Sequence, residues 1–208
     1  MRKRILSVIL AGILIVGLTG CGNQKTTDSK TNDKTKNETV QKSKGNCDVF
    51  ECIKKLSSDT TYEKVNEIIG FEGKLVDQSK EGAVSTYKKY EWELTDDTSI
   101  TVRLDEFKGK VTAQISSEFP NEMIKNDKVD FSKVDKLKEK INSSDGLTYE
   151  EFVEIVGGVE GTLYNVTTFS NKYTWVNSEG KSLNATFNSN GKCTIFNGCL
   201  LYTSPSPR

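Results

Sequence analysis

The sequence contains no histidine, and this absence excludes several kinds of catalytic site. Histidine is the side chain that titrates near neutral pH, and it is also the commonest metal ligand, so the usual general base and the usual zinc site are both missing. A Ser-His-Asp or Cys-His nucleophile needs a histidine and is excluded within this chain. We therefore predict a protein that is not an enzyme and that uses neither a cofactor nor a metal ion.

An excess of charge is also absent. Lys plus Arg and Asp plus Glu total 29 each, so the formal net charge is zero. A chain without a basic excess has no electrostatic reason to bind a phosphate backbone. We expect no nucleic-acid partner.

Proline is scarce, and two of the three prolines lie in the last ten residues. Residues 199–208 resemble translated adapter DNA, because all ten match one reading frame of a transposon adapter used for sequencing libraries. We interpret 199–208 as an adapter artefact and leave it, including Cys199, out of the fold prediction.

A long hydrophobic run occurs only at the N-terminus. Ile5 to Val16 is almost entirely apolar and follows Met-Arg-Lys-Arg. The run is too short for a membrane-spanning helix with its flanks, and it has the length of the apolar region of a secretory signal peptide. Leu18-Thr19-Gly20-Cys21 then resembles the bacterial lipoprotein box. This resemblance implies a signal peptide over 1–20 and a diacylated Cys21 that holds the protein on the outer side of the cell membrane. The alternative is an ordinary signal peptide with an unrelated cysteine.

Aromatic residues are absent from 22–46, which is rich in Lys, Thr, Asn and Ser. Such a segment buries too little apolar surface to offset its loss of conformational entropy. We expect 21–46 to be the lipidated cysteine with a disordered tether of roughly 25–30 Å root-mean-square reach. Acidic residues interrupt its lysines, so we do not interpret it as a polyanion-binding tail.

The remaining residues contain one pattern twice. The matching pairs are Thr61–Glu63 with Thr148–Glu150, Gly73–Leu75 with Gly161–Leu163, and Tyr90–Trp92 with Tyr173–Trp175. Helical spacing of apolar residues precedes strand-like alternation in both copies. We predict an α+β fold with two tandem repeats, 47–120 and 121–198, each a helix-turn-helix followed by a four-stranded antiparallel sheet.

Capping patterns locate the expected helices. Asp48 with Glu51 and Thr148 with Glu151 form capping boxes, either Thr60 or Thr61 caps a further helix, and another helix should begin near residue 132. Cysteines at 47 and 52 then flank the first helix start. There Cys47 and Cys52 form either a disulfide, which an oxidising location permits, or two free thiols, and we favour the disulfide. We expect Cys193 to be a buried free thiol.

Strand alternation predicts one apolar and one polar face for the sheet. Tyr90, Trp92 and Leu94 share the apolar face, towards the helices. The candidate binding residues lie on the polar face: Glu91, Glu93, Thr101, Arg103, Thr112, Gln114, Thr174, Asn184 and Thr186. Arg103 is the best single candidate, and Phe196 is an aromatic residue on the polar phase of its strand.

The repeated helix–helix–sheet order and the shared motifs resemble the β-lactamase-inhibitor-protein-like fold over about residues 48–198. They are also similar to lipid-anchored surface proteins of Gram-positive bacteria that carry this module. The resemblance implies that the two sheets join into one curved eight-stranded layer whose concave face holds a protein partner. Neither repeat contains the matching cysteine pair that staples each repeat of the inhibitor.

These patterns favour a lipid-anchored extracytoplasmic module that binds an envelope or extracellular protein through its polar sheet face. The alternative is an inhibitor or regulator of a β-lactamase or a cell-wall transpeptidase. Paired carboxylates such as Glu91 and Glu93 do occur, but their spacing alone does not make a glycosidase, which also needs a cleft and two different carboxyl pKa values.

Overall fold

The computed structural model describes residues 44–80, 82–143 and 145–199. The predicted signal peptide, Cys21, the tether up to residue 43 and the tail from residue 200 lie outside the described residues. The described residues belong to one unit, Val40–Arg208. They form an α+β fold, as predicted, with nine strands in one sheet, and none of their helices is long and apolar enough to cross a membrane.

The first half begins with two short helices, α1 (Val49–Lys54) and α2 (Tyr62–Ile69). Both start at predicted caps, because Asp48 Oδ1 accepts a hydrogen bond from Glu51 N at 2.9 Å and the side chain of Thr61 accepts one from Lys64 N at 3.3 Å. Four strands follow: β1 (Lys74–Gln78), β2 (Thr86–Thr95), β3 (Thr98–Phe107) and β4 (Lys110–Glu118). The ordered contacts begin earlier than predicted, since Lys44 N donates to Leu94 O at 2.9 Å.

The second half has the same sequence of elements after a connection. That connection contains a 3₁₀ turn, η1 (Asn121–Ile124), and a short strand, β5 (Lys125–Asn126). The helices are α3 (Val134–Ile141) and α4 (Tyr149–Ile155), and α4 begins at a complete capping box of Thr148 and Glu151. The strands are β6 (Thr162–Val166), β7 (Ser170–Asn177), β8 (Ser182–Asn188) and β9 (Cys193–Cys199).

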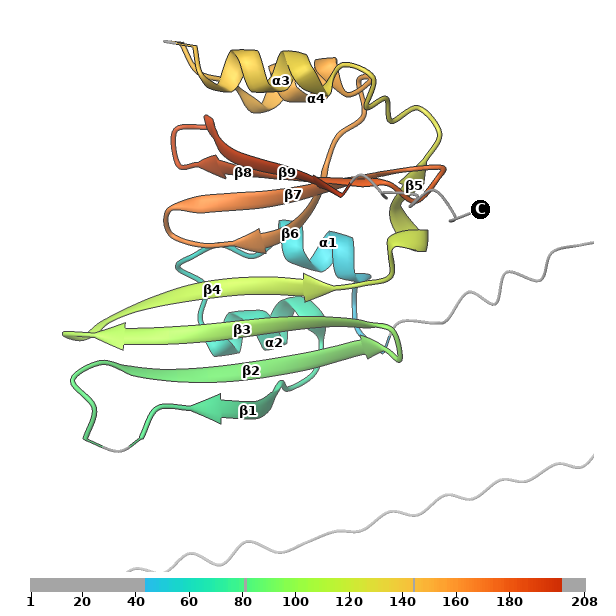
Figure 1. Ribbon diagram of the computed structural model, residues 1–208. Coiled ribbons are helices and arrows are strands. Elements are labelled where there is room, and N and C mark those ends of the chain that lie inside the picture. The colour runs from blue at the N-terminus through green and yellow to red at the C-terminus, as the bar shows by residue number, and fades with distance from the viewer. Residues whose placement is uncertain (1–43, 81, 144, 200–208) are drawn as a thin grey trace, which may run out of the picture. The chain divides into compact units, whose positions relative to one another are not determined.

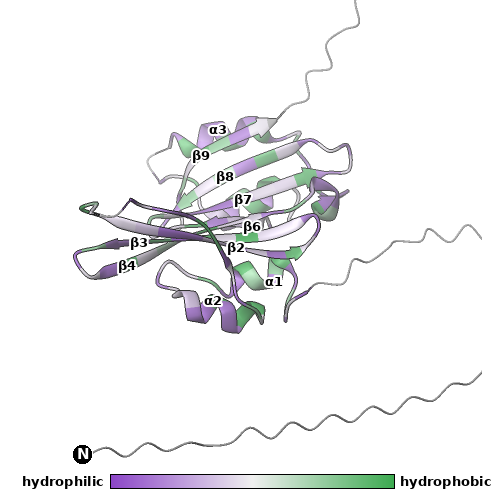
Figure 2. Cartoon of the chain, turned by 90° about the horizontal axis from the view of Figure 1, so that it is seen from below, coloured by the Kyte–Doolittle hydropathy of each residue, from purple (hydrophilic) through white to green (hydrophobic). Residues whose placement is uncertain are grey.

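The strands lie in the order β1-β2-β3-β4-β6-β7-β8-β9, with β5 beside β7 (Figure 1). Neighbours along this order are antiparallel, whereas β5 and β7 are parallel. The halves meet where β4 pairs with β6, and there Asn165 Nδ2 donates to Ile115 O at 2.9 Å. Helix α1 contacts β3, β4 and β6 and so covers this junction, and Figure 2 shows α1 and α2 on one side of the first strands.

The hydrophobic core consists of two clusters on the helix side of the sheet. The first centres on Trp92 and includes Ile53 of α1 and Ile69 of α2, all fully buried. Its members also include Val166 of β6, so the second half contributes to the core of the first. The second cluster centres on Trp175 and includes Phe152 of α4.

The repeated Tyr, Gly and Trp residues form one packed contact in the first half. The rings of Tyr62 and Tyr90 lie 4.4 Å apart between centroids, and Tyr62 OH donates to Gly73 O at 3.1 Å. A Cβ atom on Gly73 would overlap the indole ring of Trp92. Glycine is therefore required here because the tryptophan ring occupies the place of a side chain.

The second half builds a similar contact, in which the hydrogen bond runs in the opposite direction. The rings of Tyr149 and Tyr173 lie 4.7 Å apart, and Gly161 N donates to Tyr149 OH at 3.1 Å. A Cβ atom on Gly161 would overlap the indole ring of Trp175. The conspicuous sequence pattern is thus explained by core packing.

One strand departs from the predicted alternation. The pairing of β8 with β9 shifts, so that Thr186 lies opposite Ile195 but Phe187 lies opposite Cys193. The extra residue forms a β-bulge, which reverses the phase of the strand. The prediction for Phe196 is therefore wrong, because it pairs with the buried Ala185 and faces the second core cluster.

Candidate functional site

The polar face of the first half brings six predicted residues together. Backbone pairing places them on the face opposite to Trp92: Glu91, Glu93, Thr101, Arg103, Thr112 and Gln114. Glu93 and Gln114 are exposed, and the other four are half-buried. This face is continuous across β2, β3 and β4, because these strands pair along most of their length.

Arg103 is held in a defined position at the centre of this face. Its Nε donates to Asp105 Oδ1 at 2.8 Å, and its guanidinium carbon lies 4.0 Å from the centroid of the Tyr87 ring. Gln114 Nε2 donates to the second carboxylate oxygen of Asp105 at 2.8 Å. The Arg103 side chain is 44% exposed, and its hydrogen bond to Asp105 uses Nε and not the two terminal nitrogens. Tyr87, Arg103, Asp105 and Gln114 are called the arginine cluster below.

Sequence reasoning missed two members of this cluster. Tyr87 belongs to the same alternating phase of β2 as Glu91 and Glu93, so the pattern contained the information needed to place it. Its hydroxyl donates to Asp77 Oδ2 at 2.9 Å, and this bond raises the pKa of the Tyr87 phenol. Asp105 lies opposite Tyr87 in the register of β2 with β3, and its role follows only from that pairing.

The turn between β2 and β3 forms an acidic end of the same face. Glu91 and Glu93 line a shallow hollow there together with Asp96, Asp97 and Glu118. No group of three or more His, Cys, Asp or Glu residues in the described part of the chain is arranged to hold a metal ion. The polar face therefore changes along β2 from acidic side chains at one end to the arginine cluster at the other.

The second half presents less polar surface than predicted. Thr174 pairs with Asn184, and Lys172 pairs with Thr186, so the three predicted residues do share a face. Asn184 and Thr186 are half-buried, but Thr174 is only 7% exposed. Both η1 and β5 contact β7, the strand that carries Thr174. Thr174 therefore offers almost no surface to a partner.

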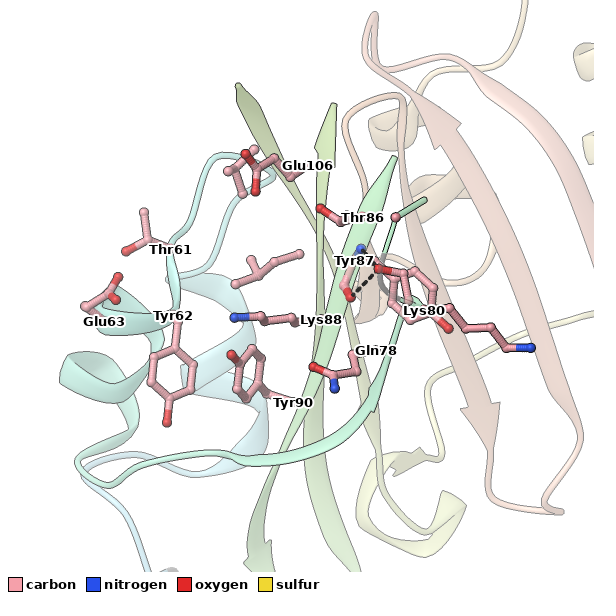
Figure 3. Close-up of a pocket in the computed structure, with 14 residues that line it drawn as sticks. Thr61, Tyr62, Glu63, Gln78, Lys80, Thr86, Tyr87, Lys88, Tyr90 and Glu106 are labelled. Atoms are coloured by element: carbon pink, nitrogen blue, oxygen red, sulfur yellow. Dashed lines mark hydrogen bonds between the residues drawn. The ribbon is translucent and has the colours of Figure 1, made fainter. Parts of the chain in front are cut away.

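A hollow of about 780 Å³ lies on the opposite side of the sheet, between the start of α2 and strands β2 to β4 (Figure 3). Tyr62, Tyr90, Leu104 and Val111 provide its apolar lining. A second hollow of about 570 Å³ lies at the start of α4 and is lined in part by Leu56, next to α1. Neither was foreseen, because each is formed by residues far apart in the sequence.

The cysteines occupy two different environments. Cys47 and Cys52 form a disulfide at the start of α1, with a Cα–Cα distance of 5.5 Å. Cys193 is a buried free thiol, and burial raises its pKa to about 11. A thiol with that pKa stays protonated at neutral pH and is a poor nucleophile.

No protein-family model, curated protein or solved structure matches this chain. A fold alone does not identify a function, which depends on specific residues at a site. The arginine cluster is the exposed site at which two predicted residues, Arg103 and Gln114, are held in a fixed geometry by Asp105.

Proposed function

We propose that this protein is a lipid-anchored, extracytoplasmic module that binds a protein partner on the polar face of its sheet, centred on Arg103. The observation that carries the proposal is the exposed guanidinium group, held by Asp105 and stacked on Tyr87. Arginine and tyrosine are enriched among residues that contribute most to binding at protein interfaces. A side chain already held in place also loses less entropy when a partner binds.

The chemistry of Arg103 defines what the partner presents to it. Its terminal nitrogens are donors in a planar fork, which fits the two oxygens of a carboxylate. The contacting group is therefore an acidic side chain or the C-terminal carboxylate of an envelope or extracellular protein. Anchoring is supported by the Leu18–Cys21 pattern, which resembles the lipoprotein box of proteins held on the outer side of the cell membrane.

The proposed scaffold consists of two tandem repeats, 47–120 and 121–198, whose sheets join into one curved layer. Two observations support it. The Tyr–Gly–Trp contact occurs in each half, and β4 pairs with β6 between the halves.

A binding assay with charge variants tests the proposal. The chain and its Arg103→Glu and Arg103→Lys variants are used to recover partners from envelope extract, and the affinity of each recovered partner is then measured. Arg103→Glu should weaken binding by about 2 kcal/mol, or roughly thirtyfold, and Arg103→Lys should weaken it less because it keeps the charge.

The matched control is Lys138→Glu, an equal change of charge on the exposed surface of α3. It should leave binding unchanged. If every partner binds Arg103→Glu as tightly as the unaltered chain, the polar face is not the binding site.

The same preparation identifies the class of partner. Titration against purified β-lactamases and cell-wall transpeptidases measures whether their turnover falls. Inhibition that Arg103→Glu abolishes would make the module an inhibitor, whereas unchanged turnover at micromolar excess would remove these enzymes as targets.

A further inference from the structure

Strand β1 forms an uncovered edge of the sheet. Among the described residues it pairs only with β2, and all five of its residues are exposed. The neighbouring aliphatic residues Leu75 and Val76 are 44% and 41% exposed. An uncovered edge presents unpaired backbone N–H and C=O groups that another strand can bind.

The second half shows what such a strand binds when a neighbour is available. β6 follows α4 as β1 follows α2, and the outer edge of β6 pairs antiparallel with β4. Leu163, which follows Gly161 as Leu75 follows Gly73, packs against the first core cluster. The molecule thus contains its own example of an antiparallel strand docked on this kind of edge.

The charges on β1 are self-complementary. Its first four residues are Lys74, Leu75, Val76 and Asp77, so opposite charges flank two aliphatic side chains. Two such strands in antiparallel register would each place a lysine opposite an aspartate. Opposite charges directly across an antiparallel pair stabilise it. The covered strand β6 has no charged residue in its range Thr162–Val166.

A bulge in β1 places these charges on one face. Lys74 pairs with Glu91 and Asp77 pairs with Lys89, so both share the polar face, and the register shifts between Leu75 and Asp77. In a regular strand, residues three apart would point to opposite faces. In a dimer with a two-fold axis perpendicular to the sheet, each residue lies on the same face in both copies. Lys74 of one copy can therefore lie opposite Asp77 of the other only because the bulge puts both residues on one face.

We propose that β1 pairs antiparallel with β1 of a second copy of this chain, with Lys74 opposite Asp77 and Leu75 opposite Val76. The interface is a two-fold one in which each copy contributes the same surface. It makes one continuous sheet from two molecules and covers the exposed aliphatic residues of both. The arginine clusters of the two copies then lie on the same face of that sheet, which would allow bivalent binding of a repetitive partner.

Charge exchange on the full-length chain tests this pairing. Two differently tagged copies are co-expressed, and self-association is measured by co-purification and by sedimentation equilibrium in detergent. Lys74→Asp and Asp77→Lys should each weaken self-association by about tenfold or more, because each places like charges opposite one another twice.

The decisive experiment mixes the two single variants, Lys74→Asp and Asp77→Lys. One variant then has acidic residues at both positions and the other has lysines at both, so the mixed dimer should form with nearly the original affinity. The double variant Lys74→Asp/Asp77→Lys should also self-associate like the unaltered chain. Circular dichroism checks that each variant is folded.

Arg103→Glu separates this inference from the proposed function, since it should weaken partner binding roughly thirtyfold and leave self-association unchanged. An unaltered chain that stays monomeric at tens of micromolar overturns the dimer, and Lys74 and Asp77 then serve to keep the edge from pairing. Failure of the mixed variants to associate overturns the proposed register.

Discussion

The two halves of the molecule share their internal packing but differ at their first strands. In each half a tyrosine contacts a glycine, and a tryptophan ring packs against that glycine. Each half also joins the loop between its two helices to a strand, because Ala113 N donates to Ser58 O and Cys193 N donates to Leu147 O, both at 2.7 Å. Leu163 nevertheless packs against the core whereas Leu75 is 44% exposed. The difference teaches that burial of this leucine depends on what lies beside its strand, not on the local sequence.

The largest expected effect concerns the feature that the halves share. Gly73→Ala and Gly161→Ala should each lower the free energy of unfolding by about 3 kcal/mol, because the added methyl group displaces a fully packed indole ring. Chemical denaturation measures both. Gly198→Ala is the control, since its Cβ would meet Leu183 at an ordinary 3.4 Å. A large loss in one half alone would show that the two contacts are not equivalent.

The next effect should separate the halves. Leu163→Ala should cost about 2 kcal/mol, since it leaves a cavity beside the first core cluster. Leu75→Ala should cost less than about 0.5 kcal/mol in the monomer, because that side chain already contacts water. Denaturation at protein concentrations too low for dimerisation makes the comparison. Equal losses at both positions would mean that β1 is covered in solution.

The smallest effect tests the disulfide, which within the described part of the chain joins two residues of the first half. Reduction of Cys47–Cys52 should lower the free energy of unfolding by about 1–2 kcal/mol, since the bond closes only a short loop. Amide hydrogen exchange should quicken in α1 and stay unchanged in α3 and α4. Faster exchange throughout both halves would indicate that α1 stabilises the whole sheet through its contact with β6.

Local patterns predicted most of the elements and one of the two polar faces. The predicted alternation places Trp92 and Arg103 on opposite faces of the strands β2 and β3, and Thr61 and Thr148 cap their helices as expected. These predictions succeeded because capping and alternation involve residues close together in the sequence.

The errors in the candidate site arise where distant residues intervene. Phe196 points into the core because of the bulge in β9, and Thr174 is buried although it lies on the polar phase of β7. The arginine cluster was recognised only through Arg103 and Gln114, since the contributions of Tyr87 and Asp105 depend on strand register.

The sequence by itself determined the α+β class, the helix starts and the side of the sheet that carries Arg103, because these follow from short-range periodicity and capping. Only the tertiary structure decided that Asp105 and Tyr87 hold Arg103, and that β6 is covered while β1 is not. Those outcomes depend on which strands meet edge to edge, and pairing between distant segments leaves no local signature in the chain.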